Sequence, residues 1–292
     1  MIEIISKYRE NPMELENFEK KRDFLICVDS DGCAMDTMDI KHIRCFGPCM
    51  VKEWGLEAWQ EAILARWNDI NLYTMTRGIN RFKGLSLALQ EIDQQYTKIE
   101  DLNTLVHWVE NSKELSNGAL ERAIAENPAS VSLKKALAWS KAVNENINAL
   151  PDELKLPFPL AKEGLAYAHA RADVAIVSSA NLDAVLEEWE KHGLLEHTDI
   201  VMAQNAGSKA HCIGELLKKG YQPDHVLMCG DAPGDMDAAQ KNGVLYYPIL
   251  VRSEKASWQE FMDTACEKLL DGTYAGAYQD EKINMFLKNL GA

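Results

Sequence analysis

The stretch Asp29-Ser30-Asp31-Gly32 places two carboxylates two positions apart, directly after the apolar run of residues 24–28. Like charges this close repel, and each carboxylate disfavours ionisation of the other unless a cation or a proton intervenes. Carboxylate oxygens are the ligands that Mg²⁺ prefers, and a carboxylate can also act as a nucleophile or carry a proton. The pair therefore predicts a metal site at which the two acids have different roles.

Three further groups of polar residues each follow an apolar run that is typical of a buried strand. They are Ser178-Ser179-Ala180-Asn181, Gly207-Ser208-Lys209 and Gly230-Asp231-Ala232-Pro233-Gly234-Asp235. The carboxyl ends of parallel strands meet at one edge of a sheet, where open α/β folds bind ligands. We therefore expect all four segments to gather at a single site.

Phosphoryl transfer gives each of these side chains a task. We expect Asp29 to be the nucleophile that attacks phosphorus and Asp31 to be the general acid and base. Ser178 and Lys209 are predicted to complete the catalytic group by donating to the non-bridging phosphate oxygens.

The same segments predict a Mg²⁺ site and a phosphate contact. The predicted metal ligands are Asp29, Asp31, Asp231 and Asp235. They offer the hard oxygen ligands that Mg²⁺ binds in octahedral geometry. Ser179 and Asn181 are candidate substrate-binding residues, although they could equally well cap the helix that follows them.

Five short apolar runs predict the strands that carry these segments. They are residues 24–29, 173–178, 199–203, 225–230 and 244–249. From residue 173 onward, the strands alternate with helical patterns at 181–193, 208–220 and 234–242. Continuous apolar runs are typical of strands buried on both faces. The spacing predicts an α/β fold with a Rossmann-like, doubly wound parallel sheet.

Residues 38–155 differ because they show helical periodicity and no convincing strand. Such an insert must leave the first strand at its carboxyl end, so we expect it to act as a lid over the two aspartates. The predicted domains are an α/β core of residues 1–37 and 156–292, with N- and C-terminal helical extensions, and an all-helical cap of residues 38–155.

At these positions the chain resembles the haloacid dehalogenase superfamily of aspartate-nucleophile phosphatases. The four motifs match, in order, Val28-Asp29-Ser30-Asp31-Gly32, Ile176-Val177-Ser178, Lys209 and Gly230-Asp231-x-x-x-Asp235. Asp36-Thr37 also looks like the Asp-Ser/Thr pair of that superfamily. The resemblance implies a mobile cap and Mg²⁺-dependent hydrolysis of a small phosphomonoester through an aspartyl phosphate.

Two details refine what the resemblance implies. The acid at position 31 matches the phosphotransferase branch, whereas the dehalogenase and phosphonate-cleaving branches lack it. Arg77-Gly78-Ile79-Asn80-Arg81 resembles the substrate-facing loop of members like phosphoglycolate phosphatase and β-phosphoglucomutase. Arg77 and Arg81 are therefore predicted to bind substrate, with a solvated helix face as the alternative.

Two other functions stay open. A sugar phosphomutase would pass the phosphoryl group from Asp29 to a second hydroxyl with the same chemistry. A phosphoacceptor or binding protein without catalytic turnover would also carry an aspartate at a strand end. The large insert and Asp31 argue against a receiver-like phosphoacceptor.

Composition limits the partners. The 292 residues have a formal net charge of −14, which argues against binding to nucleic acid or an anionic membrane. We expect a small phosphorylated metabolite as partner and a monomer or homodimer. The seven scattered cysteines predict buried, reduced thiols. No apolar run is long enough for a membrane helix, and a cytoplasmic location is expected.

Overall fold

The computed structural model describes residues 15–292 and divides the chain into two compact units. The first unit comprises Met1–Thr37 and Lys155–Ala292, and the second comprises Met38–Leu154. The two units divide after Leu154, and the sequence predicts a boundary after residue 155. The expected N-terminal helical extension falls mainly on residues 1–14, which lie outside the described part of the chain.

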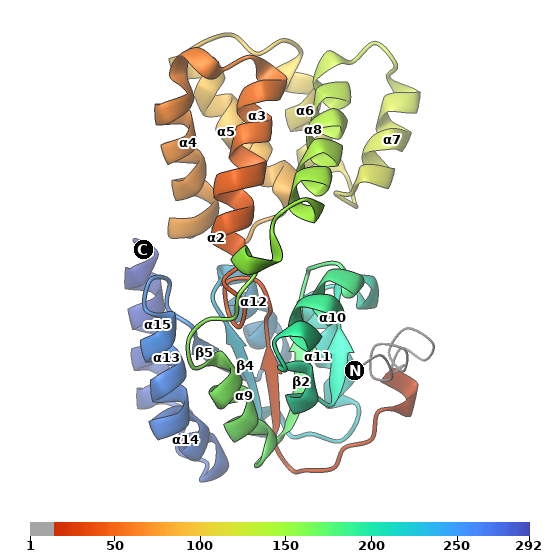
Figure 1. Cartoon of the computed structure of the whole chain (residues 1–292). Helices are drawn as coiled ribbons and strands as arrows, with labels where there is room; N and C mark the ends of the chain where they lie inside the picture. The colour runs from red at the N-terminus through yellow and green to blue at the C-terminus, as the bar shows by residue number, and fades with distance from the viewer. Residues whose placement is uncertain (1–14) are drawn as a thin grey trace. The chain divides into compact units, whose positions relative to one another are not determined.

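The first unit contains a sheet of five parallel strands (Figure 1). The strands are β1 (Leu25–Val28), β2 (Asp173–Val177), β3 (Ile200–Met202), β4 (Val226–Gly230) and β5 (Leu245–Pro248). Their order is β3-β2-β1-β4-β5, so the chain builds outward from β1 in one direction and then in the other. The predicted doubly wound parallel sheet is confirmed.

The register of the sheet brings the polar segments to one edge. Val28, the last residue of β1, pairs with Ile176 of β2 and with Cys229 of β4. The three strands therefore end at nearly the same level. Crossovers in such sheets reverse direction between neighbouring central strands, and ligands bind there, at the carboxyl ends.

Helices cover both faces of this sheet, as strands buried on both faces require. They are α9 (Ala161–His169), α10 (Leu182–Lys191), α11 (Lys209–Leu217), α12 (Pro233–Asn242), α13 (Glu254–Glu260), α14 (Cys266–Leu270) and α15 (Ala277–Asn289). Figure 1 shows α9 in front of the sheet and α12 behind it. The helix α12 contacts β4 and β5, and α15 contacts β5, where the sheet would otherwise end in an open edge.

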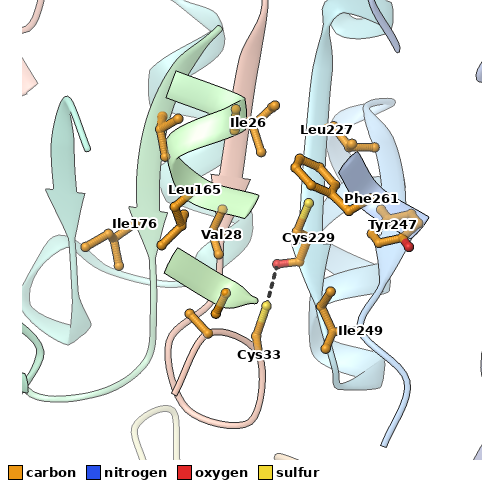
Figure 2. Packing of buried hydrophobic residues seen from close by; sticks show 14 of the residues in the cluster. Ile26, Val28, Cys33, Leu165, Ile176, Leu227, Cys229, Tyr247, Ile249 and Phe261 are labelled. Carbon is orange, nitrogen blue, oxygen red and sulfur yellow. Dashed lines mark hydrogen bonds between the residues drawn. The ribbon is translucent and has the colours of Figure 1, made fainter. Parts of the chain in front are cut away.

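One face of the sheet forms a continuous apolar core with α9, α10, α13 and α14 (Figure 2). Alternate residues point into it, such as Ile26 and Val28 from β1 and Leu227 and Cys229 from β4. Leu165 of α9 packs against them. Burial of each large apolar side chain contributes roughly 1.5–3 kcal/mol, which anchors the strands that carry the polar segments.

The second unit is built from helices joined by turns (Figure 1). They are α2 (Met38–Lys41), α3 (Gly47–Trp54), α4 (Gln60–Asn68), α5 (Arg81–Gln95), α6 (Leu102–Asn111), α7 (Asn117–Glu126) and α8 (Val131–Asn148). The turn after α7 contains Asn127 and Pro128. Residues 38–154, all of them described, include no strand.

Aromatic side chains fill the interior of this helical unit. Trp67 and Trp139 are fully buried and meet edge to face, with ring centroids 6.1 Å apart. Phe82 packs edge to face against both Trp108 and Trp139. The unit therefore has its own core, separate from that of the α/β unit.

Two predictions from composition can be compared with the structure. All seven cysteines are buried and free, as expected. Within residues 15–292, no helix combines the length and the apolarity that crossing a membrane would need.

Candidate active site

The turn after β1 presents two aspartates in different environments. The backbone N–H of Asp29 donates to the carbonyl of Cys229 in β4 (3.0 Å), and the Asp29 side chain is buried. The chain then reverses at Gly32, whose φ of 86° lies in the left-handed region that glycine adopts readily. Asp31 is partly buried, and its carboxylate accepts a hydrogen bond from the hydroxyl of Thr37.

The turn after β4 contributes two more buried acids, Asp231 and Asp235. Asp235 Oδ2 accepts a hydrogen bond from the backbone N–H of Ala232 (3.0 Å). A Cβ atom at position 230 would lie 2.3 Å from Asp235 Cγ, so only glycine fits between β4 and this carboxylate. The hydroxyl of Tyr246 in β5 donates to the Gly230 carbonyl (3.0 Å) and holds the same turn from the other side.

Lys209 joins the two turns electrostatically. It is the first residue of α11, and the hydroxyl of Ser208 caps this helix by accepting the N–H of His211 (3.2 Å). Lys209 Nζ lies 2.8 Å from Asp29 Oδ2 and 2.5 Å from Asp235 Oδ1. Its ammonium group therefore bridges the segment after β1 and the segment after β4.

Three of the four predicted metal ligands lie together. Asp29, Asp231 and Asp235 each offer one carboxylate oxygen, and these oxygens lie within 4.8 Å of one another. Three ionised carboxylates against the single positive charge of Lys209 would leave two uncompensated negative charges in a buried site. A divalent cation would balance them, and an all-oxygen donor set suits Mg²⁺. The Asp31 side chain is outside this group, so its role as a ligand stays a prediction.

The electrostatic environment separates the protonation states of these residues. Burial raises the pKa of Asp29 to about 8; Lys209 opposes the rise, while Asp235 and Asp231 add to it. Burial alone would lower the pKa of Lys209, but Asp235 and Asp29 outweigh it and bring the pKa above its ordinary value. Lys209 therefore stays protonated, and added positive charge at the site would favour ionised Asp29.

Ser178 and Asn181, which follow β2, make hydrogen bonds to the backbone of their own segment. Ser178 is buried, and its hydroxyl accepts the N–H of Ala180 (3.2 Å). Asn181 caps α10, because its side-chain oxygen accepts the N–H groups of the second and third residues after it (3.0 and 3.3 Å). Ser179 is exposed. Contacts of Ser178, Ser179 and Asn181 with a substrate remain predictions.

The two predicted substrate-binding arginines belong to the helical unit, where both make internal contacts. The Arg77 side chain is almost fully buried; its Nη1 donates to the Leu72 carbonyl (2.7 Å) and lies 3.8 Å from Asp39 Oδ1. Arg81 stacks over Phe46 and donates to Asn144 Oδ1 (2.7 Å). Burial lowers the pKa of Arg81. Both guanidinium groups thus stabilise the helical unit, and their contact with substrate remains a prediction.

Residues 104–247 match a family model described as haloacid dehalogenase-like hydrolase. Over this segment the chain is similar to the haloacid dehalogenase-like hydrolases. The matched segment includes Ser178, Lys209, Asp231 and Asp235. Asp29 and Asp31 precede it, so their assignment depends on the motif and on the geometry above. No curated protein matches the chain.

Three solved structures are similar to this chain. A candidate phosphoglycolate phosphatase from Lactobacillus delbrueckii subsp. bulgaricus is 12% identical, with 87% of this chain and 100% of that chain covered and a TM-score of 0.50. A candidate phosphatase from Clostridium difficile is 15% identical, with coverages of 78% and 86% and a TM-score of 0.47. A candidate β-phosphoglucomutase from Thermotoga maritima is 16% identical, with coverages of 85% and 97% and a TM-score of 0.43. At 12% identity, the similarity to the Lactobacillus structure shows the fold alone.

Two contacts of this site cannot be predicted from the sequence. The pairing of Asp36-Thr37 with a family motif pointed to Thr37, but not to its hydrogen bond with Asp31. The Lys209–Asp235 ion pair is not evident from the sequence either, because the motifs indicate a phosphate contact for Lys209 and a metal contact for Asp235. Both contacts orient a reactive group through a neighbour.

Proposed function

We propose that this chain is a divalent-metal-dependent phosphatase that hydrolyses a small phosphomonoester through an aspartyl phosphate on Asp29. The observation that carries the proposal is the buried cluster of Asp29, Asp231 and Asp235 around Lys209, at the carboxyl ends of β1 and β4. The match of residues 104–247 to the haloacid dehalogenase-like hydrolase model supports it.

In the first step, an Asp29 oxygen attacks phosphorus in line with the leaving oxygen, and the P–O bond to the leaving group breaks. Asp31 gives its proton to the leaving oxygen and so acts as the general acid. The Thr37 hydroxyl, which donates to Asp31, holds that carboxyl in one orientation. Lys209 Nζ lies 2.8 Å from Asp29 Oδ2 and would stabilise negative charge on the phosphoryl group.

In the second step, Asp31 takes a proton from water, which attacks the phosphorus of the aspartyl phosphate. The bond between Asp29 and phosphorus breaks, inorganic phosphate leaves and both carboxyl groups return to their starting states. One residue thus serves as acid and then as base, which requires that it is not tied to a permanent cation. This is consistent with the position of the Asp31 side chain outside the carboxylate cluster.

Asp29, Asp231 and Asp235 would hold the metal ion. A bound Mg²⁺ would offset the repulsion between the carboxylates and an anionic phosphate and would favour ionised Asp29. Lys209 and Asp235 form a buried ion pair that keeps the ammonium next to Asp29. Asp235 therefore has two tasks, since it also accepts the N–H of Ala232 and fixes the turn that carries Asp231.

The proposed substrate is a small phosphorylated metabolite. The candidate phosphoglycolate phosphatase with the same fold is compatible with this class. Arg77 and Arg81, which motivate the mutase alternative, are both engaged inside the helical unit. Release of phosphate in stoichiometric amounts from substrate would exclude a mutase.

The direct test is hydrolysis of p-nitrophenyl phosphate with Mg²⁺ and with EDTA in its place. Asp29→Asn should lower turnover by about a thousandfold or more, the scale of losing a nucleophile. Asp237→Asn is the matched control, because Asp237 lies on α12 and is exposed to solvent. Full activity in EDTA, or wild-type turnover in Asp29→Asn, would reject the proposal.

A further inference from the structure

Two fully buried tryptophans donate hydrogen bonds to the loop that carries both proposed catalytic aspartates. Trp189 Nε1 of α10 donates to Ser30 Oγ (2.8 Å), and Trp258 Nε1 of α13 donates to the Cys33 carbonyl (3.0 Å). We propose that Trp189 and Trp258 are positioning residues that hold the loop of residues 29–35 in the geometry needed for phosphoryl transfer. This inference rests on the proposed function.

The contact of Trp189 acts on the residue around which the loop is folded. The Ser30 carbonyl accepts three backbone N–H groups, those of Cys33 (3.3 Å), Ala34 (3.0 Å) and Met35 (2.9 Å). Asp29 and Asp31 are the neighbours of Ser30 on either side. A rotation of Ser30 would therefore displace both carboxylates together, and the indole N–H of Trp189 opposes that rotation by binding the Ser30 side chain.

The contact of Trp258 fixes the far end of the same loop. Cys33 is held there twice, because its carbonyl accepts the indole N–H and its Sγ donates to the Cys229 carbonyl (3.5 Å; Figure 2). That Cys229 carbonyl also accepts the backbone N–H of Asp29 (3.0 Å). The loop is thus tied to β4 at Asp29 and at Cys33, and to α13 at Cys33.

The packing of Trp258 depends on a glycine in a third helix. A Cβ atom at Gly164 of α9 would lie 2.4 Å from Trp258 Cε3, so the absence of a side chain makes room for the indole ring. Trp189 and Trp258 both belong to the apolar cluster on the α9 face of the sheet. The core that stabilises the fold therefore also sets the orientation of the two N–H donors.

Loss of an indole N–H donor should affect turnover more than substrate affinity. Each indole N–H is used within the protein, so the tryptophans act through the loop and not on the substrate. A displacement of about 1 Å at a reacting group can reduce turnover about a hundredfold. Loss of either donor should therefore lower kcat while KM changes little.

The test compares Trp189→Phe and Trp258→Phe with Trp139→Phe. The control is matched, because Trp139 is also fully buried and its Nε1 donates to a backbone carbonyl, that of Phe46 (3.1 Å), inside the helical unit. Two quantities are measured: kcat and KM for p-nitrophenyl phosphate at saturating Mg²⁺, and hydrogen–deuterium exchange of peptides that cover residues 29–36. Both test variants should lose about tenfold to a hundredfold in kcat and exchange faster in that segment, whereas the control should do neither.

Ser30→Ala provides a second route that leaves every tryptophan in place and adds no cavity. If the Ser30–Trp189 bond is what matters, the double variant Ser30→Ala/Trp189→Phe should be no slower than the slower single variant. Additive losses in kcat would overturn the role of Trp189. Unchanged exchange in residues 29–36, or faster exchange without a fall in kcat, would overturn the inference as a whole. A wild-type protein that hydrolyses no phosphomonoester would instead overturn the proposed function, and the exchange data would still decide whether the two indoles hold the loop.

Discussion

Asp29→Asn should stabilise the metal-free protein, and it should do so increasingly as pH rises. Burial among carboxylates raises the pKa of Asp29 to about 8 in the folded state, against an ordinary value of 3.8. Between these two values the folded state binds more protons than the unfolded state. The free energy of unfolding of the wild type therefore falls with increasing pH in this window and levels off above about pH 8. Asparagine cannot ionise, so the variant lacks this loss.

The size of the effect follows from the shift. Within this window, the free energy of unfolding of the wild type falls by about 1.4 kcal/mol for each pH unit. From pH 5 to pH 8 the total loss is therefore on the order of 4 kcal/mol. For a protein of this size the corresponding change in Tm is on the order of 10 °C. Because other groups titrate in the same range, the informative quantity is the difference between wild type and variant at each pH.

Thermal unfolding in EDTA at pH 5, 6, 7 and 8 measures this difference. The gap in Tm between Asp29→Asn and wild type should widen steadily toward pH 8, and saturating Mg²⁺ should close it by stabilising the wild type. Asp237→Asn controls for the loss of an exposed carboxylate on α12. If the Tm values of Asp29→Asn and wild type run parallel across the range, Asp29 does not have the raised pKa and the electrostatic reasoning fails.

Two further variants test contacts around the site. Gly230→Ala should destabilise the protein by about 1–3 kcal/mol and weaken Mg²⁺ binding in a thermal-shift titration, because the new methyl group would displace Asp235. Gly234→Ala is the control, because the space around Gly234 is open. Equal stability and equal Mg²⁺ binding of the two variants would count against the close approach of Gly230 and Asp235. Thr37→Val should slow turnover about tenfold at nearly unchanged Tm, since Asp31 loses the donor that orients it. A Thr37→Val variant with wild-type kcat would remove Thr37 from that role.

The sequence is sufficient to predict the sheet and the edge at which the site lies. Continuous apolar runs followed by Asp29, Ser178 and Asp231 are local patterns, and the parallel register then brings their ends together. The alternation of strands and helices after residue 173 predicts that the strands are parallel, and it too is a local pattern. These features depend on short stretches of chain, so they can be recognised in a single sequence.

The hydrogen-bond partners of the site could not be predicted, because they join residues far apart in the chain. Trp258 of α13 reaches Cys33, and Trp189 of α10 reaches Ser30, only when these helices have packed against the sheet. In each tryptophan the apolar ring alone explains burial, so nothing local indicates a role for the N–H group. The sequence does not distinguish the capping of α10 by Asn181 from a phosphate contact, because the same side-chain type suits both.

The most direct test of the central claim is to identify the residue that carries the phosphoryl group during turnover. Asp31→Asn should accumulate the covalent intermediate, because the variant lacks the base that activates water. After rapid acid quenching with substrate and Mg²⁺ present, mass spectrometry should find one phosphoryl group on the peptide that contains Asp29. The double variant Asp29→Asn/Asp31→Asn should show none. A phosphoryl group on any other residue, or turnover of the wild type without a covalent intermediate on Asp29, would contradict the account.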